Sequence, residues 1–321
     1  MPIRSVIDDQ LSRRILSCPD LPTLPAVALQ VLQLCRSDDV DLAAIADTVA
    51  HDPAIAAKLL RRANSASFAT RGKVASLTRA VALLGTSATL AVTLSFSFIG
   101  LRGRTRSNGL DHAGFWRRAL FSALGGRALG SLVAHDEDET FVACLLQDLG
   151  MLALDEVFPV EYRGAVQAAG GDHDALPALE TAAVGLDHVQ AGALLSRHWN
   201  LPRRLEEAVA QSHGPSLPAP GDGALRLNDA VYLSGHLADV WTGARPAEVT
   251  RAALGAAAAS LGLAAETVVV ALRRMAAALP EAASDFDLEL ASPGQLEAIL
   301  AEAQMLLGAL RPAGEASGSE P

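Results

Sequence analysis

The run HDPAIAAKLLRRANSA, from His51 to Ala66, is the most informative part of the sequence for the fold. Asp52 is placed to cap a helix, and Pro53 suits the first turn of that helix, where a missing N–H costs nothing. Four apolar side chains then recur at helical spacing before the polar pair Asn64-Ser65, so the stretch predicts one amphipathic helix packed on a core. These apolar residues are Ile55, Leu59, Leu60 and Ala63.

The same helical periodicity continues along almost the whole chain, and no alternating strand pattern of useful length occurs. Pro25 begins one helix, Asp41 caps another, and Gly85 separates two further apolar helices. The sequence therefore predicts an all-α, multi-helix bundle. The other expected helices cover residues 7–16, 114–133, 139–147, 151–158, 161–169, 186–199, 224–240, 247–261, 265–279 and 293–310, with a short one after Pro202.

The composition supports close-packed helices. Half of the 321 residues are hydrophobic and only 4% are aromatic, which disfavours a sheet. The three cysteines are far apart and lack a Cys-x-x-Cys spacing, so neither a disulfide framework nor a thiolate zinc site is indicated. Charges recur near the amino terminus, so we expect no signal peptide and a cytoplasmic location.

One uncharged segment, Ala80 to Leu101, is long enough to cross a membrane and is flanked by Arg79 and Arg102. It nevertheless contains many glycine, serine and threonine residues, and Gly85 interrupts it. We therefore interpret it as two buried core helices and expect no membrane partner.

Four separated motifs resemble, in the expected order, the HDOD family: LPTLP (21–25), HDPAIAAKLLRRAN (51–64), AVALLG (80–85) and WNLP (199–202). The resemblance covers roughly residues 18–215. It implies a bacterial all-helical domain related to the HD metal phosphohydrolases but usually without their activity. Such domains are output or adaptor modules, often connected with cyclic di-nucleotide or stress signalling and motility.

The resemblance also implies a domain organisation. An amino-terminal helix (1–17) precedes the HDOD-like domain (18–215), which contains a helical sub-bundle up to about Gly100 and a degenerate HD-phosphohydrolase-like core. Carboxy-terminal helices (216–311) are expected to pack on that core, after a linker at 214–223 that is rich in proline and glycine. Residues 312–321 are short and polar and are expected to form a disordered tail.

The resemblance places a broken metal site in the core. HD phosphohydrolases hold a divalent metal with adjacent His and Asp side chains, and in the run LLQDLG (145–150) Gln147 stands where that histidine would be. A second expected histidine is replaced by Arg118 in FWRRAL (115–120). A carboxamide is a weak ligand and a guanidinium repels a cation, so we expect no catalytic residue, no resident metal and no cofactor.

Asp148, His188 and His213 remain from such a site. Two interpretations stay open: polar side chains that hydrogen-bond across the bundle, or a surviving His–Asp–His metal site with hydrolase activity. We predict that Arg118 replaces the metal and pairs with Asp148 directly, or reaches it through Gln147, His188 or one water. Trp116 and Trp199 are expected to anchor the core. The other histidines are expected to be solvated: His112, His135, His173, His198 and His236.

The charge distribution is lopsided. The net charge of −10 argues against general nucleic-acid binding, yet residues 53–118 hold eleven basic side chains and one acid, Asp111. Either these cations pair with acids such as those of DEDE (136–139), or they form an anion or partner site. The best candidates for such a site are Arg102, Arg104 and Arg106.

Three functions follow from these observations. The first is a non-catalytic signalling or adaptor module that meets signalling proteins in trans and is linked to cyclic di-nucleotide signalling. The second is a metal-dependent phosphohydrolase with an atypical Asp/His site. The third is a regulator that binds a nucleotide second messenger or another anion through the expected basic loop that carries Arg102, Arg104 and Arg106.

Overall fold

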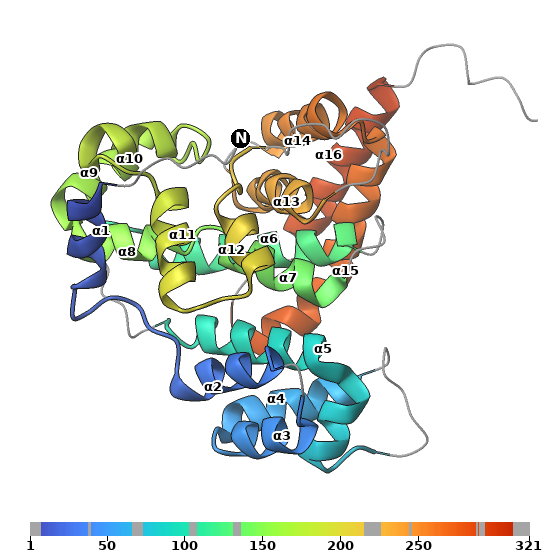
Figure 1. Ribbon diagram of the computed structural model, residues 1–321. Coiled ribbons are helices and arrows are strands. Elements are labelled where there is room, and N and C mark those ends of the chain that lie inside the picture. The colour runs from blue at the N-terminus through green and yellow to red at the C-terminus, as the bar shows by residue number, and fades with distance from the viewer. Residues whose placement is uncertain are drawn as a thin grey trace, which may run out of the picture.

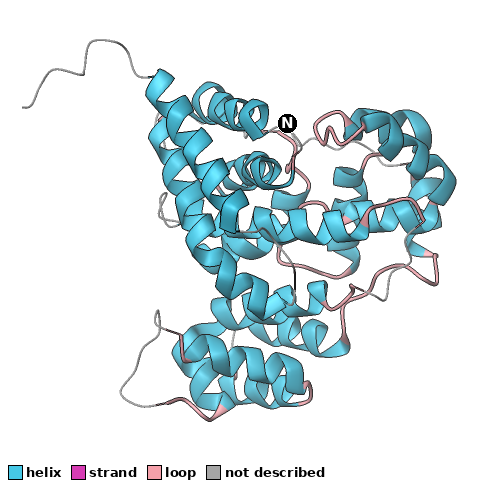
Figure 2. Cartoon of the chain, turned by 180° about the vertical axis from the view of Figure 1, so that it is seen from behind, coloured by secondary structure: helices cyan, strands magenta, loops and turns pink. Residues whose placement is uncertain are grey.

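The computed structural model describes residues 8–37, 40–65, 73–102, 108–130, 136–214, 226–243, 246–286, 288 and 293–310. These residues form helices joined by loops, and none of them forms a strand (Figure 2). The predicted all-α class is confirmed. The expected linker, except Gly214, and the expected tail lie outside the described residues, as does His135, and the domain boundaries stay predictions.

An amino-terminal sub-bundle lies at the bottom of the view in Figure 1 and has a hydrophobic core of its own. As predicted, the Asp52 carboxylate caps one of its helices by accepting hydrogen bonds from the N–H groups of Ala54 and Ile55, at 2.9 and 3.1 Å. Ile55, Leu59 and Ala63 are buried below that cap. The helices are α2 (Ala26–Cys35), α3 (Leu42–Ala50), α4 (Pro53–Ala63) and α5 (Leu77–Ile99).

Helix α5 contains the predicted break. Gly85 has φ +78°, a conformation that side chains with a Cβ rarely adopt, and the chain continues as helix on both sides. By length and composition α5 could cross a membrane, but 61% of its most apolar window is buried inside the fold. Its apolar side chains thus serve the core, as predicted.

The larger bundle is built around α6 (His112–Gly130), which packs against α7 (Glu137–Leu146), α13 (Leu227–Thr242) and α15 (Ala265–Phe286). Trp116 is fully buried and Trp199 is 4% exposed, so both anchor this core as predicted. The remaining helices of the bundle are α8 (Gly150–Val157), α9 (Pro159–Ala169), α10 (Leu176–Val184), α11 (His188–His198), α12 (Arg203–Val209), α14 (Pro246–Leu261) and α16 (Pro293–Leu310).

Two helices differ from the expected ones. Helix α10 was not predicted, and α15 runs through Pro280 to Phe286 instead of ending near Leu279. Helix α1 (Asp9–Leu16) lies beside α8 and α11 of the larger bundle, away from the sub-bundle that follows it (Figure 1). The end of α15 reaches the sub-bundle, where Phe286 stacks on Phe96 with ring centroids 4.4 Å apart.

Candidate functional site

The predicted pair between Arg118 and Asp148 exists and is direct. Arg118 lies in α6, and its Nη1 donates to Oδ2 of Asp148 in the turn between α7 and α8. The same guanidinium donates from Nε to Oδ1 of Asp239 in α13, at 2.8 Å. The cation therefore bridges two carboxylates from two different segments, and one of them, Asp239, was not identified from the sequence.

Among the described residues, the Gln147 side chain bonds to a hydroxyl and not to either of these carboxylates. Its side chain is 2% exposed, and its Nε2 donates to the hydroxyl of Ser122 in α6. The residue that stands in the place of the HD histidine therefore ties α7 to α6, and it offers no strong metal ligand.

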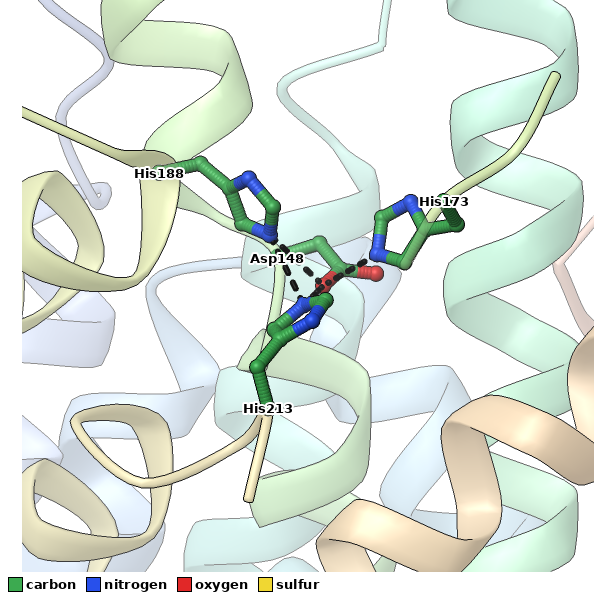
Figure 3. Close-up of side chains that lie close together, drawn as sticks. All are labelled: Asp148, His173, His188 and His213. Atoms are coloured by element: carbon green, nitrogen blue, oxygen red, sulfur yellow. Dashed lines mark hydrogen bonds and ion pairs between the residues drawn. The ribbon is translucent and has the colours of Figure 1, made fainter. Parts of the chain in front are cut away.

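The second oxygen of Asp148 faces three histidines (Figure 3). Oδ1 lies 3.3 Å from Nε2 of His173 and 3.7 Å from Nε2 of both His188 and His213. The Nε2 atoms of His188 and His213 are 2.9 Å apart. We call these four residues the Asp–His cluster; its donor atoms all lie within 4.8 Å of one another.

The expectation that His173 is solvated is wrong. The residue follows α9 in a turn, yet its side chain is only 10% exposed because the turn folds back over Asp148. Four further histidines were expected to be solvated. His135 lies outside the described residues, and of the other three only His198 is exposed. His112 lies 3.3 Å from the buried Asp155, and His236 packs edge-on against Tyr232.

Local sequence explains how His188 reaches the cluster. Asp187 and Gln190 form a capping box that begins α11 at His188. Helix α8 crosses this point at Gly150, whose Cα lies so close to the His188 carbonyl and the Gly192 N–H that an added Cβ would overlap them. The crossing thus requires glycine at position 150, and it brings the first residue of α11 next to Asp148.

A buried carboxylate orients the His188 ring from behind. Glu180 of α10 is fully buried, and its Oε2 accepts hydrogen bonds from Nδ1 of His188 at 2.6 Å and from the His188 backbone N–H at 2.8 Å. With the Nδ1 proton held there, Nε2 of His188 points to Asp148. Glu180 was missed from the sequence because α10 was missed.

Burial and neighbouring charges shift the pKa values of the residues in this site in opposite directions. Burial alone would raise the pKa of Asp148, but Arg118 and His173 hold that pKa well below its usual range. Burial lowers the pKa of His173 to about 4, and it also lowers the pKa of His213. Burial opposes a charge on His188 too, but Glu180 outweighs it and raises the pKa of His188.

The donors of the site suit a metal ion only in part. The two positions that resemble HD ligands, Arg118 and Gln147, do not fit a metal, because one is a bound cation and the other is engaged with Ser122. The Asp–His cluster does fit, since three imidazole nitrogens and one carboxylate oxygen form an ordinary ligand set for zinc-like ions. Any such ion would sit on the side of Asp148 opposite Arg118.

Part of the basic segment is paired with acids where the structure describes it. Arg62 lies 3.3 Å from Asp138, within the predicted acidic run, whereas Lys58 and Arg61 pair with Asp285 at the end of α15. The pairing interpretation is confirmed for these cations. Arg102 is exposed at the end of the α5 segment, and Arg104 and Arg106 lie outside the described residues, so the proposed anion site stays a prediction.

Comparison with known proteins identifies the family of this chain. Residues 21–215 match the HDOD domain family. The chain belongs to the HDOD family. An HDOD protein of unknown function from Geobacter sulfurreducens has a similar fold, with a TM-score of 0.62 at 18% identity over 87% of this chain and 96% of that one. A protein of Shewanella amazonensis SB2B, whose name proposes a phosphohydrolase, aligns with a TM-score of 0.57 at 19% identity over 94% and 97% of the two chains.

A further relative has no described function. The uncharacterized protein of Treponema pallidum (strain Nichols) is 24% identical over 200 residues, which are 60% of this HDOD chain and 38% of the relative. The match thus spans well under half of the relative's length. At these identities the solved structures support the shared fold alone.

Proposed function

We propose that this HDOD protein is a non-catalytic signalling module that acts through contacts with other proteins. The observation that carries the proposal is the guanidinium of Arg118 between Asp148 and Asp239. Hydrolysis by a metal centre needs carboxylate and imidazole ligands that leave an open position for water. Here the carboxylate oxygens on one side of the site are held by a permanent cation instead.

The partners proposed are signalling proteins in trans, and a cyclic di-nucleotide signal is compatible with the family. Neither a membrane nor a nucleic acid is proposed as a partner, because α5 is mostly buried and the net charge is −10. Affinity capture from the native host with the tag-free chain would identify the partner, and reconstitution with the purified partner would verify direct contact.

We expect no metal-dependent turnover of cyclic di-nucleotides, hyperphosphorylated guanosine or simple phosphate esters with Mg²⁺, Mn²⁺ or Fe²⁺. The reason is that Arg118 and Gln147 occupy the two ligand places. Product formation should equal that of a metal-only blank, measured by chromatography for nucleotides and by absorbance for nitrophenyl esters. Turnover that Asp148→Ala abolishes would refute the non-catalytic assignment.

The basic loop should recognise the partner. Replacing Arg102, Arg104 and Arg106 together by alanine should weaken partner binding while leaving the thermal midpoint nearly unchanged, since surface ion pairs contribute about 0–1 kcal/mol. The binding is measured by titration calorimetry and the midpoint by differential scanning calorimetry. A midpoint several degrees lower, or unchanged partner affinity, would mean that these arginines have another role.

Two alternative functions have specific tests. A metal-dependent phosphohydrolase is favoured by the convergence of the Asp–His cluster, and the turnover assay decides it. A nucleotide-binding or anion-binding regulator is favoured by the three arginines near residue 104. A nucleotide affinity that falls steeply with salt and depends on those arginines would support it.

A further inference from the structure

We propose that the Asp–His cluster of Asp148, His173, His188 and His213 binds one divalent transition-metal ion of the zinc, cobalt, nickel and ferrous class. The ion would have a structural or regulatory role, held by four protein ligands. This inference goes beyond the signalling function and does not depend on it.

The spacing of the donor atoms matches a tetrahedral site. With metal–nitrogen and metal–oxygen bonds of about 2.0–2.1 Å, the ligand atoms of a tetrahedron lie about 3.3–3.4 Å apart. The measured separations from Asp148 Oδ1 are 3.3, 3.7 and 3.7 Å, and Nε2 of His188 lies 2.9 Å from Nε2 of His213. These four separations lie within about 0.5 Å of the tetrahedral value, and the remaining two, from Nε2 of His173 to Nε2 of His188 and of His213, are at most 4.8 Å. Small movements of the side chains, largest for His173, would therefore complete the coordination shell.

Two of the four atoms that would bind the metal make no hydrogen bond within the described part of the protein. Oδ1 of Asp148 and Nε2 of His173 are both buried, and neither has a hydrogen-bond partner of suitable geometry, although they lie 3.3 Å apart. Buried polar atoms without partners are uncommon and costly. A metal ion between them would satisfy both atoms at once.

Glu180 supplies the outer support that a metal-binding histidine needs. A carboxylate that holds the Nδ1 proton of a histidine fixes the ring and raises the basicity of Nε2, which is the usual arrangement behind a metal-bound imidazole. Glu180 does this for His188 at 2.6 Å, from a position that is fully buried. A residue that only filled the core would not need a charge there.

The charge balance suits a divalent cation. Asp148, Asp239 and Glu180 carry negative charges around the site, and Arg118 is the one permanent cation that pairs with them among the described residues. Two negative charges are therefore uncompensated when the histidines are neutral. A second ion is disfavoured because Arg118 already holds Oδ2 of Asp148 and the carboxylate of Asp239.

The donor types select the ion. Imidazole nitrogens with one carboxylate suit zinc, cobalt, nickel and ferrous ions, whereas magnesium and calcium require oxygen ligands. Binding would join the α7–α8 turn, the turn after α9, the first residue of α11 and the segment after α12. The metal would thus fasten four segments of the core together.

The test is a cobalt titration of tag-free protein that has been stripped with a chelator. We expect one cobalt ion per chain with the intense visible absorption of tetrahedral Co²⁺, displacement by Zn²⁺, and no displacement by excess Mg²⁺. Absence of the visible band, or equal competition by Mg²⁺, would overturn the proposal.

Variants assign the site. His173→Ala and His213→Ala should each lower cobalt affinity by at least about tenfold, and Glu180→Gln should lower it by about 10–100-fold. His236→Ala is the matched control, because its side chain is 11% exposed against 10% for His173, and it should bind cobalt like the wild type. Circular dichroism verifies folding, and His173→Gln replaces His173→Ala if that variant unfolds. Unchanged affinity in folded variants of both His173 and His213 would place the metal elsewhere.

Discussion

Arg118→Ala should lower the free energy of unfolding by about 3–5 kcal/mol, because it leaves the buried Asp148 carboxylate without its cation. Asp148 is 2% exposed, and Asp239 loses the same partner. Replacing both members of the pair, as Arg118→Met with Asp148→Leu, should cost clearly less than Arg118→Ala, since the buried Asp148 charge is then removed and only Asp239, whose side chain is 21% exposed, loses its cation. Urea unfolding followed by circular dichroism measures both.

The control for this prediction is Arg197→Ala, which removes an exposed ion pair with Glu206 and should cost about 1 kcal/mol or less. The pH dependence gives a second check. The pKa of Asp148 is held below its usual range in the folded protein. The stabilisation that the ionised Asp148 gives to the folded state is therefore fully present above the unfolded pKa of about 3.9, and it is lost as the pH falls through the folded pKa. If Arg118→Ala costs no more than Arg197→Ala at pH 7, the buried pair is not what stabilises the core.

Gly150→Ala should destabilise the protein by about 3 kcal/mol, at the upper end of the range for overpacking. The new Cβ would overlap the His188 carbonyl and the Gly192 N–H, which are backbone groups and cannot rotate away. Helices α8 and α11 would have to separate, and His188 would move away from Asp148. Thermal and urea unfolding measure the loss of stability, and the cobalt titration measures the displacement of His188.

Gly164→Ala is the matched control for Gly150→Ala. Gly164 lies in α9, is exposed, and has no atom within 4 Å of an added Cβ. Alanine in a helix is favoured over glycine by about 0.5–1 kcal/mol, so this variant should be as stable as the wild type or slightly more stable. A Gly150→Ala protein that is equally stable would show that the α8–α11 crossing is looser than described.

The sequence predicted those parts of the fold that neighbouring residues determine. Asp41 and Asp52 begin α3 and α4 because a carboxylate at the N-cap accepts hydrogen bonds from the N–H groups two and three residues ahead. Gly85 breaks α5 because its positive φ suits a residue without a Cβ. Each of these interactions is local, so a single sequence shows it.

Helix α10 was missed because it has no side-chain cap and is only nine residues long. Two signals could have revealed it: Pro177 in its first turn, and Gly185 at its end with φ +94°. With α10 identified, Glu180 would have stood out as an acid on a helix otherwise made mostly of alanine and leucine.

The complete site could not be predicted from one sequence. Arg118, Asp148, His188 and His213 were identified through the resemblance to the HD family, and the structure brings all four together. His173 and Asp239 reach the site only through tertiary packing. A histidine in the polar turn GDHD resembles any solvated residue, whereas Asp239 gave a weak signal as a lone acid between the apolar residues Ala238 and Val240.

We infer that Arg118 holds the carboxylate oxygens that a catalytic metal would need, so that the core takes no more than one ion. The most direct measurement is the number of metal ions per chain by plasma mass spectrometry, after tag-free protein is saturated with Mn²⁺ or Co²⁺ and passed through a desalting column. We expect no more than one ion per wild-type chain. Two ions per wild-type chain would contradict this inference.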